Sequence, residues 1–281
     1  MSDTIISNVG VVMPKLIYGT AWKKERTSTL VESALRCGFR GIDTACQPKH
    51  YNEAGVGEAL QTLRAEGLKR EAVFLQTKFT PLEGQDPSSV PYDKNAPLPE
   101  QIAHSFEVSL ENLRTDYIDS YLLHSPLFPF SRLITAWQAM EEIVIKGGAK
   151  QLGISNCYEL SMLKRLYDEA KVKPAVLQNR FYADTNYDTD IRAFCDDHDI
   201  RYQSFWSLTA NPHLVGSETV LRAAMKRHLE PAQIFYAYLM EKGIIPLDGT
   251  TSLEHMKGDL GVLDISLTPE EISAIDTLIF P

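Results

Sequence analysis

The sequence predicts an α/β fold, a (β/α)8 TIM barrel with an N-terminal β-hairpin and extra C-terminal helices. Two observations predict it. Eight short runs rich in β-branched and aromatic residues alternate with longer segments of helical period. Each run is followed by such a segment, which is the pattern of βα units around a parallel sheet. The 281 residues suffice for one such barrel, so we expect a single domain over 1–281.

The strands are expected where the apolar runs lie. A hairpin is predicted over 5–13, and its two strands precede the barrel. The eight barrel strands are predicted over 15–19, 41–44, 73–78, 117–124, 150–155, 175–181, 201–206 and 243–247.

The helices are expected between these runs, and glycines mark several of their ends. Gly38 and the pair Gly147–Gly148 follow helical segments, where glycine commonly terminates a helix. The tail helix begins at Thr268, where Thr-Pro-Glu-Glu offers an N-cap and acids in the first turn. The other helices are predicted over 26–37, 53–66, 99–113, 131–146, 159–170, 189–198, 217–226 and 231–242, with one more starting near Ser252.

Composition excludes several classes of function. The chain has 28 Lys and Arg against 37 Asp and Glu, a formal net charge of −9, so it has no general attraction for nucleic acid or anionic membranes. The first residues lack the pattern of a signal peptide, and no apolar run is long enough for a membrane helix. Four scattered cysteines form no CxxC pair, so we expect free thiols in a cytoplasmic location and no metal site. A monomer is the default expectation.

Four reactive side chains fall near strand ends. Asp43 closes the second predicted strand, Lys78 the third and His124 the fourth, and Tyr51 follows Asp43 by eight positions. Singly, each is more often a structural residue. Together they mark a site, because TIM barrels build active sites at the C-terminal ends of their strands.

Longer strings carry a resemblance to a known family. GFRGIDTACQPKHYNEAGVGEAL resembles the aldo-keto reductase signature, VFLQTKF that family's lysine strand and RTDYIDSYLLHSP its histidine strand. KQLGISN, VLQNRFY and GIIPLDGTTS resemble its later strands, so the likeness extends over nearly the whole chain. It implies an NAD(P)H-dependent reductase that passes a hydride to an aldehyde or ketone.

The resemblance implies a role for each of the four residues. Tyr51 would be the proton donor, and Lys78 would make its phenol more acidic by stabilising the phenolate. Asp43 would hold Lys78, and His124 would orient the substrate oxygen. Relatives that reduce steroid double bonds resemble the pattern with Glu in place of this histidine, so His124 favours ordinary carbonyl reduction.

The chain departs from the family pattern just before the tyrosine. In most members the tyrosine follows the aspartate by five residues, whereas Pro48 stands there in this chain. We interpret this as a three-residue insertion within 46–50, which makes Lys49 and His50 further candidates for the pocket.

The resemblance also implies cofactor-binding positions. Ser155, Asn156 and Gln178 would hold the nicotinamide, and Phe205 would stack on it. The other expected cofactor residues are Thr20, Trp206, Leu208, Thr250, Thr251, Ser252 and His255. The last four belong to a loop and helix start, which is a natural anion site.

The identity of the dinucleotide is less sharply defined. The family favours NADPH. However, the resemblance implies a Pro-Lys-Ser run and a following arginine that hold the extra phosphate of NADPH. Here Leu247 and Asp248 follow Pro246, and His255 stands in place of the arginine, which leaves NADH open.

The expected substrate is a small carbonyl compound in a pocket lined by Trp22, Phe79 and Phe128. Segment 79–98 is a long loop on the same rim, either a substrate cover or a surface insertion. Cys46 and Cys157 are also expected on this rim, where thiol oxidation would inhibit.

Two other functions compete with this one. Some relatives are potassium-channel auxiliary subunits that bind a nicotinamide cofactor with little turnover. A metal-dependent hydrolase of the same fold would need His-x-His or carboxylate clusters at strand ends, and the sequence has none.

Overall fold

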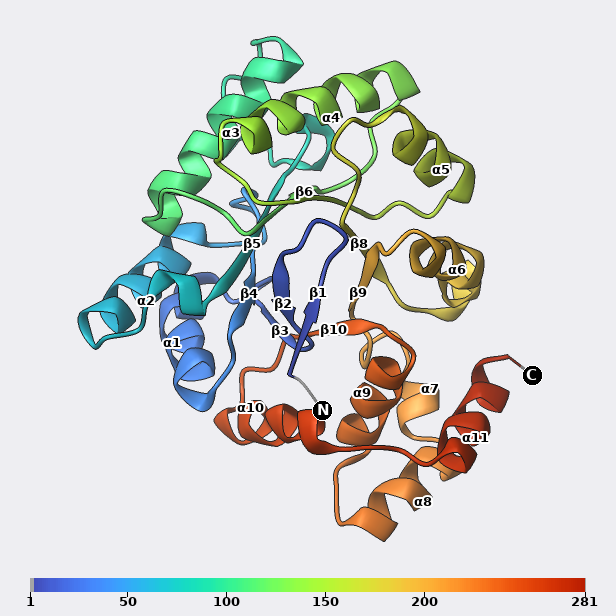
Figure 1. The fold of residues 1–281 in the computed structure, drawn as a ribbon. Coiled ribbons are helices and arrows are strands. Elements are labelled where there is room, and N and C mark those ends of the chain that lie inside the picture. The colour runs from blue at the N-terminus through green and yellow to red at the C-terminus, as the bar shows by residue number, and fades with distance from the viewer. Residues whose placement is uncertain (1–2, 281) are drawn as a thin grey trace.

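A computed structural model describes residues 3–280, and its centre is a closed barrel of eight parallel strands (Figure 1). The strand order is β10-β3-β4-β5-β6-β7-β8-β9, so the first barrel strand pairs with the last. This confirms the predicted fold class. The strands are β3 (Ile17–Gly19), β4 (Gly41–Asp43), β5 (Phe74–Phe79), β6 (Ser120–Leu123), β7 (Leu152–Ser155), β8 (Val176–Arg180), β9 (Arg201–Phe205) and β10 (Ile245–Asp248).

The predicted N-terminal hairpin is also present. Strands β1 (Thr4–Ile6) and β2 (Val12–Pro14) pair in antiparallel register. Met13 is fully buried in an apolar cluster with Phe74, Val176 and Ile245, which lie at the start of their strands. The hairpin therefore closes the N-terminal end of the barrel, and the opposite end stays open for a site (Figure 1).

Helices surround the barrel, and α7, α8 and α11 lie outside this ring (Figure 1). Helix α7 was not predicted, and the ends of the other helices differ from the predictions by only a few residues. The helices are α1 (Thr27–Cys37), α2 (Glu53–Ala65), α3 (Leu98–Leu113), α4 (Phe130–Ile145), α5 (Leu160–Glu169), α6 (Thr189–Asp197), α7 (Pro212–Val215), α8 (Glu218–Arg227), α9 (Pro231–Glu241), α10 (Leu253–Leu260) and α11 (Pro269–Ile279). Short 3-10 turns are η1 (Lys24–Arg26), η2 (Arg70–Ala72), η3 (Leu82–Gly84), η4 (Ala183–Asp188) and η5 (Gly261–Asp264).

The principal core lies between the strands and this ring of helices. Trp137 of α4 is fully buried there, and Phe106 of α3 meets Tyr121 of β6 edge to face with ring centroids 4.9 Å apart. The predicted N-cap of α11 is present, since the Thr268 hydroxyl accepts from the Glu271 N–H and the Glu271 side chain accepts from the Thr268 N–H. Within residues 3–280, no helix combines the length and apolar character that crossing a membrane requires.

Helix α2 approaches the end of α3 so closely that only glycine fits at position 57. A Cβ atom on Gly57 would lie 2.0 Å from the Asn112 carbonyl oxygen, and this neighbour is backbone that does not rotate away. The packing of α2, which follows the catalytic-rim loop, therefore depends on this residue.

We predict that Gly57→Ala destabilises the protein by about 1–3 kcal/mol, because the two helices must move apart. Thermal unfolding followed by circular dichroism measures it. Gly258→Ala is the control, since its added Cβ would find its nearest neighbour at 3.6 Å. Equal melting temperatures for the two variants would contradict the close contact.

Candidate active site

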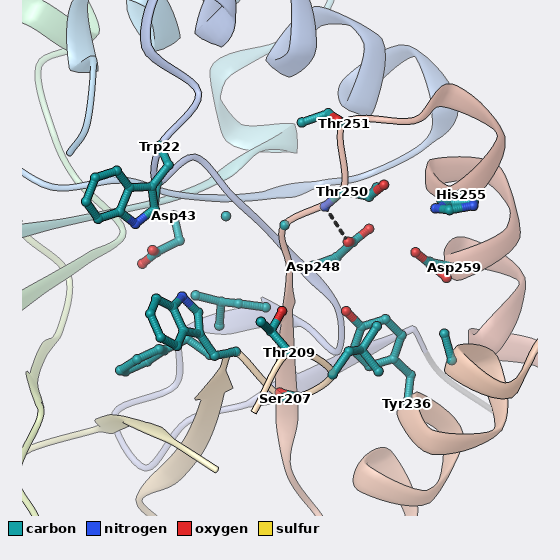
Figure 2. Close-up of a pocket in the computed structure, with 18 of the residues that line it drawn as sticks. Trp22, Asp43, Ser207, Thr209, Tyr236, Asp248, Thr250, Thr251, His255 and Asp259 are labelled. Carbon is teal, nitrogen blue, oxygen red and sulfur yellow. Dashed lines mark hydrogen bonds between the residues drawn. The ribbon is translucent and has the colours of Figure 1, made fainter. Parts of the chain in front are cut away.

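One large cavity of about 1260 Å³ opens at the C-terminal ends of the strands. Asp43, Tyr51 and His124 line one part of it, and the loop after β10 with helix α10 lines another (Figure 2). A small carbonyl compound would fill only a fraction of this volume. The cavity is therefore large enough for a dinucleotide and a substrate together.

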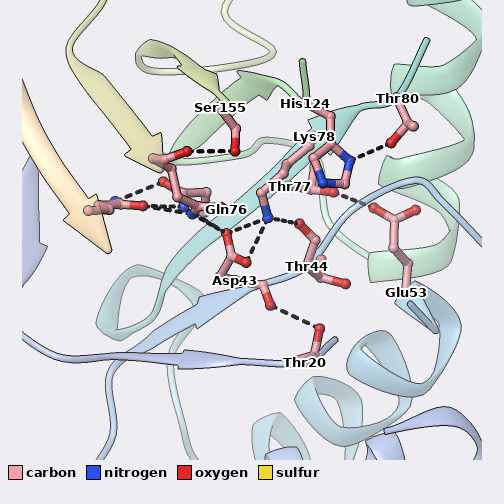
Figure 3. Close-up of polar contacts among 12 residues, drawn as sticks. Thr20, Asp43, Thr44, Glu53, Gln76, Thr77, Lys78, Thr80, His124 and Ser155 are labelled. Carbon is pink, nitrogen blue, oxygen red and sulfur yellow. Dashed lines mark hydrogen bonds and ion pairs between the residues drawn. The ribbon is translucent and has the colours of Figure 1, made fainter. Parts of the chain in front are cut away.

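An ion pair between Asp43 and Lys78 forms the floor of the site (Figure 3). The Lys78 ammonium donates to both Asp43 carboxylate oxygens, at 2.7 and 2.6 Å, and to the Thr44 carbonyl at 2.8 Å. Lys78 is fully buried, and burial lowers its pKa, an effect that Asp43 opposes. Asp43 closes β4 and Lys78 lies on the paired strand β5, as the sequence predicted.

Tyr51 lies beside this pair. The Lys78 ammonium is 5.3 Å from the centre of the Tyr51 ring. Its three N–H groups already have acceptors, so none is left for the phenol oxygen. Burial, with a smaller contribution from Asp43, raises the pKa of Tyr51 above its usual value. Lys78 therefore makes no hydrogen bond to this phenol, and its role in making Tyr51 more acidic stays a prediction.

His124 completes the group. Its ring meets that of Tyr51 edge to face, with centroids 5.8 Å apart. Its Nδ1 lies 2.7 Å from the Thr80 hydroxyl oxygen. Burial, with help from Lys78 and His50, places the pKa of His124 well below its usual value, so the imidazole is neutral. When the Thr80 hydroxyl donates to Nδ1, the proton of the neutral ring sits on Nε2.

Ser155, Asn156 and Gln178 line the cavity beside this group. The Gln178 amide N–H groups donate to Asp43 and Gln203, so this side chain offers only its oxygen to a ligand. Asn156 donates to the His124 carbonyl.

Thr20 differs from its neighbours. It is buried, its hydroxyl donates to the Asp43 carbonyl, and it does not line the cavity. The expected cofactor contact by Thr20 is therefore wrong, and its hydroxyl supports β4 instead.

Phe205, Trp206 and Leu208 line the next part of the wall, as expected. Sequence reasoning did not select Arg180 or Thr209, which line it too. The Arg180 guanidinium lies 4.3 Å from the centre of the Trp206 ring. The sequence does contain a signal for Arg180, because this residue comes two positions after Gln178 and so lies on the same face of β8.

The loop after β10 is only partly the anion site that was expected. Thr250, Thr251 and His255 line the cavity (Figure 2). The Thr250 N–H donates to Asp248 at 2.8 Å, so it is not free for a ligand. Ser252 is absent from the cavity wall, because its hydroxyl caps α10 by accepting from the His255 N–H. Ser252 is thus corrected to a helix cap.

The same wall contains two neighbouring carboxyl groups, Asp248 and Asp259 (Figure 2). They lie close enough that the ionisation of one disfavours the ionisation of the other. Burial, followed by the charge of Asp248, raises the pKa of Asp259 to about 7. Lys23 and His255 are the nearby bases. Asp259 was missed, although its place four residues after His255 puts both on one helix face.

Of the three expected substrate residues, only Trp22 lines the cavity. Phe79 is fully buried against Tyr92, with ring centroids 5.4 Å apart, because it follows the inward-facing Lys78 on its strand and therefore points outward. Phe128 is 61% exposed and lies off the cavity wall. The expectation that Phe79 and Phe128 line the substrate pocket is therefore wrong.

Segment 79–98 does not cover the cavity, since none of its residues lines it. Instead, the Tyr92 hydroxyl and the Gln85 amide donate to the Thr80 carbonyl, and Gln85 also donates to the Cys46 carbonyl. The segment packs against the loop that precedes Tyr51, so the expected cover is corrected to a support.

Neither rim cysteine is exposed to the cavity. Cys46 and Cys157 are buried, and burial raises the pKa of both thiols, to about 12 for Cys157. The expectation of oxidation-sensitive thiols facing the pocket is therefore wrong. Residues 3–280 contain no cluster of three or more His, Cys, Asp or Glu arranged to hold a metal ion.

Comparisons with known proteins agree with this geometry. The model described as Aldo/keto reductase family matches residues 15–228. The uncharacterized oxidoreductase YtbE of Bacillus subtilis is 30% identical over 273 residues, which cover 96% of this chain and 90% of the relative. Methylglyoxal reductase DkgA of Escherichia coli is 29% identical over 272 residues, with the same coverage of 96% and 90%.

A solved structure gives the same result. The crystal structure of an aldo/keto reductase from Brucella melitensis superposes with a TM-score of 0.82 at 29% sequence identity. The match covers 99% of this chain and 100% of that one.

We predict that Asp43→Asn destabilises the protein by about 3–5 kcal/mol, because it leaves the Lys78 ammonium buried without a counter-charge. Urea denaturation measures this loss. In the matched double variant, Asp43→Asn with Lys78→Met, most of the stability returns, since no buried charge is left. A single variant as stable as the wild type would contradict the importance of the pair.

A second prediction concerns pH. The raised pKa of Asp259 means that ionisation disfavours the folded state, so its contribution to stability falls as the pH rises from about 4 to about 7. Asp259→Asn removes this loss. The melting temperature of the variant relative to the wild type should therefore increase over that range and level off above pH 7. A difference independent of pH would contradict the raised pKa of Asp259.

Proposed function

Because this chain belongs to the aldo/keto reductase family, we propose that it reduces aldehydes or ketones to alcohols with Tyr51 as the proton donor. One observation carries the proposal. Tyr51 and His124 lie together beside the buried Asp43–Lys78 pair, at one end of a cavity large enough for a dinucleotide. No other tyrosine and histidine on the described part of that wall have their rings in contact.

The residues at hand fit a nicotinamide cofactor, which when bound supplies the hydride. The Gln178 oxygen is suited to accept from a carboxamide N–H group, since its own amide hydrogens are committed. The Phe205 ring offers an apolar face on the same wall. Ser155 and Asn156 complete the proposed nicotinamide site, with Trp206 and Leu208 farther along it.

Tyr51 and His124 would act on the substrate oxygen. Both are neutral, since one pKa is raised and the other lowered, so each can offer a hydrogen. As the carbonyl is reduced, its oxygen becomes an alkoxide, which is a stronger base than a phenolate. Tyr51 can therefore donate its proton to that oxygen despite its raised pKa. The hydrogen bond from His124 would hold the oxygen in place.

The family favours NADPH, and the far wall of the cavity weakens this preference. Thr250, Thr251 and His255 are the proposed contacts there. A phosphate on the ribose would also meet the carboxyl groups of Asp248 and Asp259. We therefore propose that NADPH binds and that NADH competes with it, because the acidic pair disfavours extra negative charge.

Several coarser properties accompany this function. The unpaired cysteines of the described residues favour a reducing compartment, and we propose a cytoplasmic location and a monomer. The alternative, a channel regulatory subunit with little turnover, has no support among the relatives. Turnover of a reactive aldehyde is the observation that separates the two.

We predict that Tyr51→Phe lowers kcat for para-nitrobenzaldehyde by about a hundredfold or more, because the proton donor is removed. Dinucleotide affinity should stay near that of the wild type, as judged by quenching of Trp22 and Trp206 fluorescence. Cofactor consumption is followed by absorbance, with NADPH and NADH in parallel. Near-normal turnover in the variant would assign the proton donor to another group.

A further inference from the structure

His50 is a cavity residue that the proposed mechanism does not use. It comes from the inserted segment 46–50 and lines the main cavity directly before Tyr51. It also borders a second, smaller cavity of about 440 Å³, together with Lys49 and Tyr51. His50 and Tyr51 therefore line both cavities together.

The His50 ring is held in place from two sides. Trp22 packs against it with ring centroids 3.9 Å apart and ring planes inclined by 37°, and the Trp22 backbone N–H donates to the His50 carbonyl at 2.7 Å. The His50 N–H donates to the Gln47 carbonyl at 3.0 Å. The imidazole is thus pre-organised in the cavity wall.

The hydrogen bonds around Gln47 determine which nitrogen of His50 carries the proton. The Gln47 amide N–H donates to the Gly84 carbonyl at 2.6 Å, and a carbonyl can only accept. The Gln47 side-chain oxygen therefore faces the other way and lies 3.0 Å from Nδ1 of His50. Nδ1 must then carry the hydrogen, and Nε2 of the neutral ring is a hydrogen-bond acceptor.

His50 is neutral near pH 7. Burial, followed by the charge of Lys49, lowers the pKa of its imidazole. The neighbouring imidazole of His124 is itself neutral and adds no negative charge that would favour the protonated ring. Tyr51 and His124 are the proposed donors to the carbonyl oxygen, whereas His50 offers an acceptor.

We propose that His50 determines substrate specificity by accepting, through Nε2, a hydrogen bond from a hydroxyl group next to the substrate carbonyl. The preferred substrates are then α-hydroxy aldehydes and α-hydroxy ketones. This inference rests on the proposed function, because it takes Tyr51 and His124 as the groups that hold the carbonyl oxygen.

The chemistry of the neighbouring substituent decides the preference. A hydroxyl satisfies the Nε2 lone pair, whereas an alkyl group of the same size leaves that nitrogen without a partner. A carboxylate in the same place brings a second acceptor against it. A site built around a hydrogen bond rejects analogues that lack the donor more strongly than an apolar pocket rejects a hydroxyl.

The test compares two ketones of nearly equal shape, α-hydroxyacetophenone and propiophenone. The wild type should show a kcat/KM for the hydroxyketone that is larger by roughly tenfold, as one neutral hydrogen bond allows. His50→Phe keeps a ring for Trp22 to stack on and removes the acceptor, so the ratio should fall to near one. Lys49→Ala, in the same inserted segment, should keep the wild-type ratio.

A second measurement does not depend on turnover. Nitrogen NMR of protein with 15N-labelled histidine should show an unprotonated Nε2 for His50, identified by its loss in His50→Phe. In Gln47→Leu this tautomer should no longer dominate, and the ketone ratio should decrease. A protonated Nε2 in the wild type would overturn the inference.

The outcomes separate this inference from the function beneath it. Turnover of para-nitrobenzaldehyde, together with equal kcat/KM for the two ketones, would overturn the role of His50 and leave the proposed reductase standing. The role of His50 is equally overturned if His50→Phe, folded as judged by circular dichroism, keeps the wild-type ratio. Absence of turnover on all three compounds with either cofactor would overturn both.

Discussion

The buried ion pair of Asp43 and Lys78 is the interaction on which the rest of the site depends. Burying two charges is costly unless their hydrogen bonds are satisfied, and here every Lys78 donor has an acceptor. Asp43 also accepts from Gln76 and Gln178, which meet on Gln203. These partners come from β4, β5, β8 and β9, so only a closed barrel brings them together.

Because all its N–H groups already have acceptors, Lys78 has little stabilisation left to give to a Tyr51 phenolate. A fully hydrogen-bonded ammonium beside a carboxylate has little net charge to offer a phenol 5.3 Å away, measured to its ring centre. Burial then dominates the acidity of Tyr51. In the proposed reaction, Tyr51 and His124 would therefore act as two neutral hydrogen-bond donors beside a neutralised ion pair. The alkoxide that forms on the substrate would then be the base that takes the proton from Tyr51.

Sequence reasoning recovered the barrel because alternating strands and helices report burial directly. It placed Asp43, Lys78 and His124 together because they fall at or just after strand ends, whereas Tyr51 was selected only through the family resemblance. It failed where local rules compete. Phe79 follows an inward-facing lysine, so the period of two in a strand already excluded it from the pocket. Ser252 was both a ligand candidate and a helix cap, and the cap prevailed. The meeting of Asp259 with Asp248 joins two elements, which only the folded chain reveals.

Segment 46–50, which we interpret as an insertion, and the long segment 79–98 are hydrogen bonded to each other. Gln47 bonds to Gly84, and Gln85 bonds back to the Cys46 carbonyl. The same long segment holds the Thr80 carbonyl, while the Thr80 hydroxyl contacts His124. A longer rim loop without this support would leave its residues free to turn. Through Gln47 and Thr80 these segments contact the imidazoles of His50 and His124, so the long segment shapes the site without touching the cavity.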